Sequence, residues 1–312
     1  MAPVSTFPRV VPAETHAVPD ELSDLGYTLR WRRGFAMASW VVEHATTEDG
    51  HHEVRRTWEA AQPWASALIV HGIGEHSGRY QHVAQQMVDN GINASAIDLF
   101  GFGGSDGRRA YVDSADRYLD QIECGLGRAG EAGVPTVLVG HSMGGLLSLS
   151  YALSDRPPPD LLVLSAPALD AAITPWKRFL TPYLAKVLPK LAIPLDISGE
   201  QLSRDPRVGE AYFADELVET SSTTGLGAML LTTMNAAQAE CHRLRIPTLV
   251  LHGQDDELVP ASFTERLESV DVVERRTKPG LRHEMFNEPE GPEIVDEMIG
   301  WIREQVGLME KR

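Results

Sequence analysis

Short runs of consecutive apolar residues recur along the chain and alternate with longer amphipathic segments. The clearest of these runs predict strands at residues 67–70, 94–99, 136–139, 161–164 and 248–251. Strands without polar alternation, separated by helices, are typical of a parallel sheet that helices cover on both faces. The pattern therefore predicts an α/β fold with a mostly parallel central sheet.

Weaker patterns extend this sheet at both ends. Strand-like runs at 37–43 and 52–58 flank Glu48-Asp49-Gly50, which is a hairpin signal, and another run covers 272–277. Helical spacing predicts covering helices at residues 80–90, 115–128, 146–153, 262–270 and 292–306. Gly91 is expected to end the first of them. Residues 1–24 contain four prolines and no apolar period, so we expect an irregular N-terminal arm there.

One segment interrupts the alternation. About eighty residues separate the strand ending at Ser165 from the strand starting at Thr248, far more than a simple crossover needs. Its apolar residues follow a helical period: Trp176, Phe179, Leu180, Tyr183, Leu184, Val187, Leu188 and Leu191. Because Pro182 interrupts this stripe, we expect a kink or two short helices. The predicted organisation is a core of residues 25–166 and 226–312, with a helical cap of residues 167–225 inserted after the sixth strand.

Two interpretations of the apolar stripe stay open. The stripe either packs on the core or forms a cap over the active site, with an apolar channel and a lipid-docking face. Residues 171–195 contain four basic residues and no acidic one: Lys177, Arg178, Lys186 and Lys190. Such a segment in an acidic protein favours transient docking to an anionic membrane or micelle, although a merely solvated face explains it equally well.

Composition limits the classes of function. The 312 residues are 43% hydrophobic and carry a net charge of −16, which disfavours a nucleic-acid partner. Cys124 and Cys241 form no disulfide framework. We find neither a spanning apolar segment of about 20 residues nor a secretory signal, so we expect a soluble cytoplasmic protein. The sequence suggests no metal and no organic cofactor.

The most informative motif is Gly140-His141-Ser142-Met143-Gly144. It fits G-x-S-x-G, follows the apolar run at 136–139 and opens a helical segment. This strand, tight turn and helix are what a nucleophile elbow requires, because the flanking glycines let the backbone bend sharply and expose the serine hydroxyl. The motif predicts Ser142 as a catalytic nucleophile, against the alternative of an ordinary surface serine in a glycine-rich loop.

A serine nucleophile at such an elbow is followed in the chain by an acid and then by a histidine. Three acids follow the strand at 248–251, and the G-x-x-D spacing favours Asp256 over Asp255 and Glu257. A turn or a helix N-terminus would also explain an acid there. The predicted base is His283, in the loop before the last helix. Two other histidines after Ser142 suit structural roles better: His242 and His252.

Acyl transfer also requires two donors for the oxyanion. One is the backbone N–H of Met143, directly after the nucleophile. The other is expected in the loop His71-Gly72-Ile73-Gly74 after the third predicted strand, where the glycines free the amide of Ile73 to point inward. The alternative is that these glycines only make a tight strand-to-helix turn.

These motifs resemble the monoacylglycerol lipase group of the α/β-hydrolases. The resemblance covers about residues 50–308 and rests on these segments: 71–80, 140–145, 164–167, 202–206, 211–212, 252–256 and 283–289. It implies an enzyme that cleaves the single acyl ester of a glycerol. It also implies that Glu75 and Arg79 form a polar alcohol pocket near Ser142, with His141 and Tyr212 in contact with the alcohol.

The chain departs from many relatives at two positions. Phe102 stands where they carry a histidine in a D-x-x-G-H-G-x-S turn, and Phe286 stands where some have a histidine that recognises glycerol. From the motifs and the resemblance together, we predict a serine ester hydrolase acting on monoacylglycerols through an acyl-enzyme. The alternatives are a lysophospholipase or a general carboxylesterase and, from another class, a catalytically idle lipid-binding hydrolase fold.

Overall fold

The computed structural model describes residues 14–15, 40–47 and 50–311. The rest of the predicted N-terminal arm, the first residues of the strand predicted at 37–43, and Glu48 and Asp49 of the predicted turn lie outside the described residues. Within the arm, Glu14 and Thr15 form a two-residue strand, β1, which pairs with the next strand.

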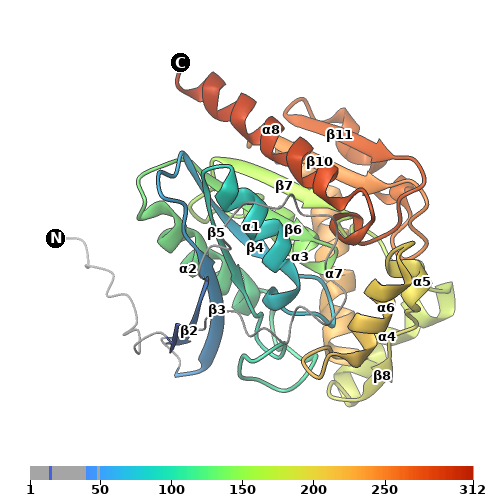
Figure 1. Cartoon of the computed structure of the whole chain (residues 1–312). Coiled ribbons are helices and arrows are strands. Elements are labelled where there is room, and N and C mark those ends of the chain that lie inside the picture. Colours follow the sequence, from blue (N-terminus) through green and yellow to red (C-terminus); the bar gives the residue numbers. More distant parts are fainter. Residues whose placement is uncertain (1–13, 16–39, 48–49, 312) are drawn as a thin grey trace.

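A nine-stranded sheet, mostly parallel, forms the centre of the described chain (Figure 1). Its strands after β1 are β2 (Trp40–Thr46), β3 (His52–Trp58), β4 (Ala65–Val70), β5 (Ile92–Ile97), β6 (Thr136–His141), β7 (Leu161–Ser165), β10 (Thr248–Gly253) and β11 (Val273–Lys278). The spatial order is β1-β2-β3-β5-β4-β6-β7-β10-β11, and all pairs from β5 to β11 are parallel. The predicted fold class is confirmed.

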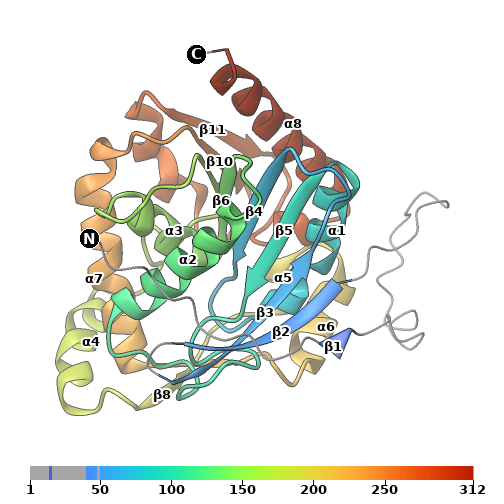
Figure 2. The same cartoon turned by 90° about the vertical axis from the view of Figure 1, so that its left-hand side faces the viewer.

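Helices cover both faces of this sheet (Figure 2). One face packs against α1 (Gln81–Asp89) and α8 (Gly291–Met309), and the other against α2 (Ala115–Gly130), α3 (Met143–Ala152) and α7 (Thr224–Glu240). Consecutive residues of β4 divide between the two cores, with Ile69 in the first and Leu68 in the second. This two-sided burial explains why the strands read as continuous apolar runs.

Local signals set the helix ends. The Ser114 side chain accepts the N–H of Asp116 at the start of α2, and Thr223 caps α7 by accepting the N–H of Leu226. Gly91 ends α1 with a φ of +82°, a conformation that glycine adopts without strain.

The short helices of the core are 3-10 helices: η2 (Ser77–Tyr80), η3 (Cys241–Arg243), η4 (Ala261–Ser269) and η5 (Met285–Asn287). The helix predicted at 262–270 is thus a 3-10 helix.

The segment between β7 and α7, which we call the insertion (residues 166–223), lies beside one end of the sheet (Figure 1). It contains α4 (Pro175–Val187), α5 (Gly199–Leu202), α6 (Pro206–Ala214) and a small antiparallel pair, β8 (Ala192–Pro194) with β9 (Ser221–Thr223). Of the two alternatives expected at Pro182, a kink or two short helices, the second is wrong, because α4 is one helix with this proline inside it.

The apolar stripe of α4 does not pack on the core. Trp176, Phe179 and Val187 expose 61%, 65% and 78% of their surface, and the other stripe residues are also exposed. A packed stripe, one of the two interpretations of the sequence, is therefore wrong. Of the basic residues, Arg178 is ion-paired with Asp170, and the side chain of Lys177 lies outside the described part.

Candidate active site

Ser142 lies alone between a strand and a helix, because β6 ends at His141 and α3 begins at Met143. Its φ and ψ are 52° and −117°, and a positive φ is uncommon for a residue with a side chain. The neighbouring glycines have no room for a Cβ atom. One on Gly144 would lie 2.2 Å from the carbonyl oxygen of Val70, and one on Gly140 would lie 2.4 Å from that of Gly144. The turn is therefore packed tightly against β4, and this fixes the serine at the carboxyl end of the sheet.

His283 and Asp256 form a buried hydrogen-bonded pair. The Nδ1 atom of His283 lies 2.7 Å from Oδ2 of Asp256, in the loops that follow β11 and β10. The other carboxylate oxygen, Oδ1, accepts the backbone N–H groups of Leu258 and Val259 at 2.9 and 2.8 Å. Because a carboxylate is an acceptor only, Nδ1 of His283 carries the proton and Nε2 is left as the basic nitrogen.

Burial and charge act in opposite directions on this pair. Burial opposes ionisation of Asp256, but the charge of His283 and hydrogen bonds from His252, His283 and the Val259 amide hold its pKa well below the ordinary value. Burial lowers the pKa of His283, but the charge and hydrogen bond of Asp256 outweigh it, so that this pKa is raised. A histidine with a raised pKa is a stronger base for a serine hydroxyl.

The competing residues lie elsewhere. Asp255 is exposed, and its N–H donates to the carbonyl of Leu281. His252 is buried beside Asp256 and lies 2.7 Å from the carbonyl oxygen of Val259, so it supports the acid loop. His242 lies 3.0 Å from the carbonyl oxygen of Ala239, at the end of α7. The structure thus brings Asp256, and not Asp255, to His283.

No hydrogen bond joins the Ser142 hydroxyl to His283 among the described residues. The two residues are nevertheless close, because the ring of His141, next to the serine, lies 4.8 Å from the ring of His283. Hydrogen bonds between nucleophile and base are often long in an unliganded enzyme and tighten with substrate.

Two backbone amides close to the serine have no acceptor among the described residues. In the described part of the chain, the N–H groups of Ile73 and Met143 donate to no protein atom. His71 holds the loop of Ile73 in place. Its Nδ1 lies 2.7 Å from the Gly72 carbonyl oxygen, and its Nε2 accepts the Leu99 N–H at 2.9 Å. A Cβ atom on Gly72 would lie 3.1 Å from Cβ of Ser142, so this loop lies directly against the nucleophile.

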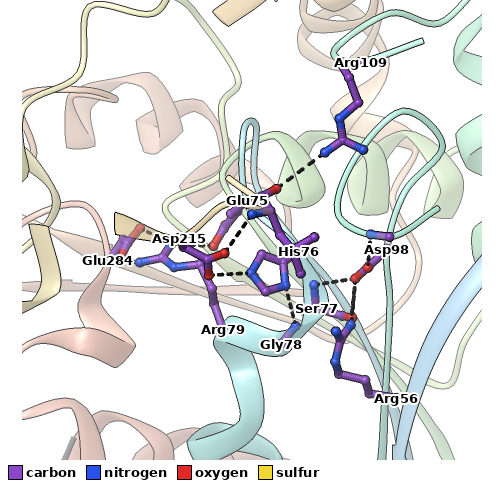
Figure 3. A network of polar contacts seen from close by, with 12 residues as sticks. Arg56, Glu75, His76, Ser77, Gly78, Arg79, Asp98, Arg109, Asp215 and Glu284 are labelled. Atoms are coloured by element: carbon purple, nitrogen blue, oxygen red, sulfur yellow. Dashed lines mark hydrogen bonds and ion pairs between the residues drawn. The ribbon is translucent and has the colours of Figure 1, made fainter. Parts of the chain in front are cut away.

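A cluster of buried charges lies beside the same loop (Figure 3). Arg79 donates through Nη1 to Glu75 and to Glu284, each at 2.7 Å, and through Nη2 to the second oxygen of Glu284 at 2.8 Å. Glu75 also accepts the Gly72 N–H at 2.6 Å and the Tyr80 hydroxyl at 2.8 Å. Burial opposes its ionisation, but Arg79 and the other partners lower its pKa to about 2. These three charges help line a pocket next to Ser142, together with His141 and Phe286.

His141 and Tyr212 complete the surroundings of this cluster. Burial and the nearby His283 lower the pKa of His141 to about 4, which keeps its ring neutral near pH 7. Tyr212, from α6 of the insertion, lies with its ring 4.8 Å from the guanidinium carbon of Arg79. Its hydroxyl is buried and has no hydrogen-bond partner among the described residues. The four residues that the resemblance assigned to an alcohol pocket therefore lie together.

The two departures from the relatives have different surroundings. Phe286 lines the pocket. Phe102 is fully buried and packs its edge on the ring of His71, 5.7 Å between centroids, so it supports the loop of Ile73 from behind. Of the two phenylalanines, the structure therefore brings only Phe286 to the pocket.

Sequence reasoning missed two features of the cluster. Glu284 directly follows His283, and this position was its only local signal. His76 pairs with Asp215 of the insertion, with Nε2 and Oδ2 2.9 Å apart (Figure 3). The Glu219 N–H donates to the Gly74 carbonyl oxygen at 2.7 Å. The insertion is thereby held against the loop that follows β4.

The parallel sheet, the serine elbow after β6 and the acid and histidine loops after β10 and β11 define an α/β-hydrolase. The family model described as "Serine aminopeptidase, S33" matches residues 61–290. A monoacylglycerol lipase from Mycolicibacterium smegmatis is 33% identical over 252 residues, which are 77% of this chain and 88% of the relative. Phospholipase YtpA from Bacillus subtilis is 29% identical over 76% of this chain and 95% of its own length.

A solved structure agrees with these sequence matches. The crystal structure of Paleococcus ferrophilus monoacylglycerol lipase has a TM-score of 0.73 and 29% sequence identity, and covers 82% of this chain and 98% of that one. The chain belongs to the α/β-hydrolase family and, within it, to the monoacylglycerol lipase group; it is a carboxylic ester hydrolase. None of its described helices is both long and apolar enough to cross a membrane.

Proposed function

We propose that the protein hydrolyses monoacylglycerols to glycerol and fatty acid through an acyl-enzyme on Ser142. His283, oriented by Asp256, removes the proton from the serine hydroxyl, and the alkoxide attacks the ester carbonyl. The amides of Ile73 and Met143 stabilise the oxyanion, and His283 then gives its proton to the departing alcohol. Water repeats these steps on the acyl-enzyme and regenerates the free serine.

One observation carries this proposal. A serine elbow, a buried histidine–carboxylate pair and two backbone amides that have no acceptor among the described residues meet at one edge of the sheet. The chemistry of acyl transfer requires all three. The catalytically idle alternative is disfavoured, because an idle fold usually has a damaged set of catalytic residues.

The buried polar pocket supports glycerol as the alcohol. An acyl chain is apolar and would offer no hydrogen bond to the charged groups of Glu75, Arg79 and Glu284. Hydroxyl groups both donate and accept hydrogen bonds, so they suit a pocket that is lined by carboxylate oxygens. Tyr212, whose ring lies against Arg79, adds a hydroxyl that has no partner among the described residues. The relative named phospholipase keeps a lysophospholipid as the second candidate substrate.

The test compares hydrolysis of 1-monooleoylglycerol and the matching lysophosphatidylcholine by the wild type and by Ser142→Ala. We expect the glycerol ester to be the better substrate and the variant to lose at least about 10³-fold in kcat. Labelling with a fluorophosphonate reports whether Ser142 is the nucleophile, since the wild type is labelled and the variant is not. Unchanged turnover by the variant would contradict the mechanism, and a preference for the phospholipid would contradict the choice of alcohol.

We further propose that the insertion is a cap and that the exposed face of α4 docks transiently on a lipid surface. Trp176, Phe179 and Tyr183 all lie exposed on α4, and large exposed apolar patches mark interaction sites. Because Arg178 is neutralised by Asp170, the apolar surface supports docking more than the charge does.

Flotation with phosphatidylcholine vesicles, with and without phosphatidylglycerol, tests the docking. Phe179→Asp is expected to release the protein from both kinds of vesicle. The matched control is Leu308→Asp, since Leu308 is 45% exposed on α8, at the other end of the molecule (Figure 1). If both variants float as the wild type does, α4 is not the docking surface.

A further inference from the structure

The polar pocket beside Ser142 contains more negative than positive charge. Among the residues that line it, the carboxylates are Glu75 and Glu284, and the only cation is Arg79. All three side chains expose 7% or less of their surface. Arg79 neutralises one carboxylate in total, so the cluster keeps one negative charge.

The other titratable residues of the pocket do not change this balance. Burial lowers the pKa of His82, and burial with the charge of His283 lowers that of His141 to about 4, so that both rings are neutral near pH 7. Burial and the charge of Glu75 raise the pKa of Tyr80 well above its ordinary value, so its hydroxyl stays protonated. The His283–Asp256 pair next to the pocket adds no net positive charge, since Asp256 is ionised.

Three of the five N–H groups of Arg79 are already bonded to carboxylates. Nη1 donates to both carboxylates and Nη2 donates to Glu284, while the ring of Tyr212 covers one face of the guanidinium. Asn287 also donates its side-chain N–H to Glu284, at 2.7 Å. A phosphate that bound Arg79 would either displace a carboxylate from the bidentate pair or use the N–H groups left on Nη2 and Nε beside that carboxylate, and in both cases it would meet the excess negative charge of the cluster.

The nucleophile lies within reach of this charge. The position that a Cβ atom on Gly72 would occupy lies 2.7 Å from Oε1 of Glu75 and 3.1 Å from Cβ of Ser142. The carboxylate and the serine are therefore no further apart than the sum of these distances. At such a separation inside a protein, one unit of charge changes the binding of a charged group by tenfold or more.

We propose that Glu284 is a specificity-determining residue, which makes the alcohol pocket net negative and so excludes monoacyl esters of phosphorylated glycerol in favour of esters of neutral glycerol. This inference rests on the proposed function, because it assigns the pocket to the alcohol of the substrate. It differs from a plain glycerol site in that the rejection of phosphate depends on the second carboxylate.

The test uses two short, water-soluble substrates, 1-butyrylglycerol and 1-butyrylglycerol 3-phosphate, so that docking on lipid does not enter. We expect wild-type kcat/KM to be at least about tenfold higher for the neutral ester. In Glu284→Gln, the ratio of kcat/KM for the neutral ester to kcat/KM for the phosphate ester is expected to fall about tenfold, chiefly because KM for the phosphate ester falls. The glutamine oxygen in the place of Oε2 keeps the bonds from Asn287 and Nη2 of Arg79, whereas the bond from Nη1 is lost because the amide NH₂ takes the place of Oε1.

Two controls separate this role from others. Glu265→Gln, an exposed change on η4, is expected to leave the ratio unchanged. p-Nitrophenyl butyrate has neither glycerol nor phosphate, so its hydrolysis by Glu284→Gln measures any general effect of the substitution on the chemical step, and the two glycerol esters are compared relative to it. An equal loss on all three substrates would mean that Glu284 positions His283, and would overturn the proposal.

If the variant does not fold, the wild type alone tests the proposal: equal kcat/KM values for the neutral and the phosphorylated ester would overturn it. An unchanged ratio in a folded Glu284→Gln does the same. The proposed function fails by a different result, namely hydrolysis of p-nitrophenyl butyrate that persists in Ser142→Ala.

Discussion

Replacing Asp256 by asparagine changes one atom of the site, and the structure specifies which hydrogen bonds that atom loses. Oδ1 accepts two backbone N–H groups, from Leu258 and Val259, and Oδ2 accepts the ring N–H of His283. An asparagine keeps the two backbone bonds only if its oxygen stays at Oδ1. Its NH₂ group then faces Nδ1 of His283, and two donors meet.

The histidine resolves this conflict by moving its proton to the other nitrogen. Nδ1 becomes the acceptor and Nε2 carries the proton, so Nε2 can no longer remove a proton from Ser142. Loss of the correct tautomer in a serine triad lowers kcat by about 10⁴, which corresponds to about 5.5 kcal/mol of transition-state stabilisation. The cost in folding free energy is smaller, about 1–3 kcal/mol, because His252 still has the Val259 carbonyl oxygen as a partner.

The assay is steady-state hydrolysis of p-nitrophenyl butyrate, with thermal unfolding as the check on folding. The neighbouring change Asp255→Asn is a matched control, because it removes the same charge from the same loop at an exposed position that does not contact His283. We expect its kcat within about twofold of the wild type. The reasoning is refuted if Asp255→Asn loses activity while a folded Asp256→Asn keeps it.

Three further predictions follow from the same geometry. Because Asp256 raises the pKa of His283, wild-type kcat/KM should rise with pH as this histidine loses its proton, with a midpoint above the ordinary histidine pKa of 6.5. In Asp256→Asn this midpoint should move to lower pH, and an unchanged midpoint would contradict the interaction between the two residues. Gly144→Ala places a Cβ atom 2.2 Å from a β4 carbonyl oxygen and should lower Tm. Gly307→Ala adds a methyl group in open space on α8 and should stabilise the fold by about 0.5–1 kcal/mol. Equal Tm values for the two variants would refute the packing argument. Tyr212→Phe removes a buried hydroxyl without a partner, so it should leave Tm unchanged but raise KM for monobutyrylglycerol and not for p-nitrophenyl butyrate.

Much of the fold and of the site could be predicted because the signals are local. Consecutive apolar residues indicate a strand buried on both faces, and the elbow is contained in five residues whose glycines have no room for a side chain. The spacing G-x-x-D was enough to favour Asp256, since the turn after β10 directs one of the two adjacent acids toward His283. The roles of these residues stay predictions until the variants are measured.

The features that could not be predicted depend on contacts between distant segments. The helical period of α4 is the same whether its apolar face packs on the core or stays exposed, and only the tertiary structure distinguishes the two. Pro182 lies inside one helix because the chain tolerates the lost hydrogen bond there. The pairing of Arg79 with Glu284 joins residues 205 positions apart, and no local pattern indicates it.

The loop after β4 links catalysis to recognition of the alcohol. It contains both the Ile73 amide and Glu75, and the Glu75 carboxylate, which lines the pocket, accepts the Gly72 N–H and so holds the loop in shape. A change at Glu75 would therefore disturb both the oxyanion site and the pocket. Glu284 also lines the pocket, where it pairs with Arg79 and accepts from Asn287, and its side chain has no bond to residues 71–75 in the described chain. Because of this asymmetry, a substitution at Glu284 can change the charge of the pocket while the oxyanion donors keep their positions.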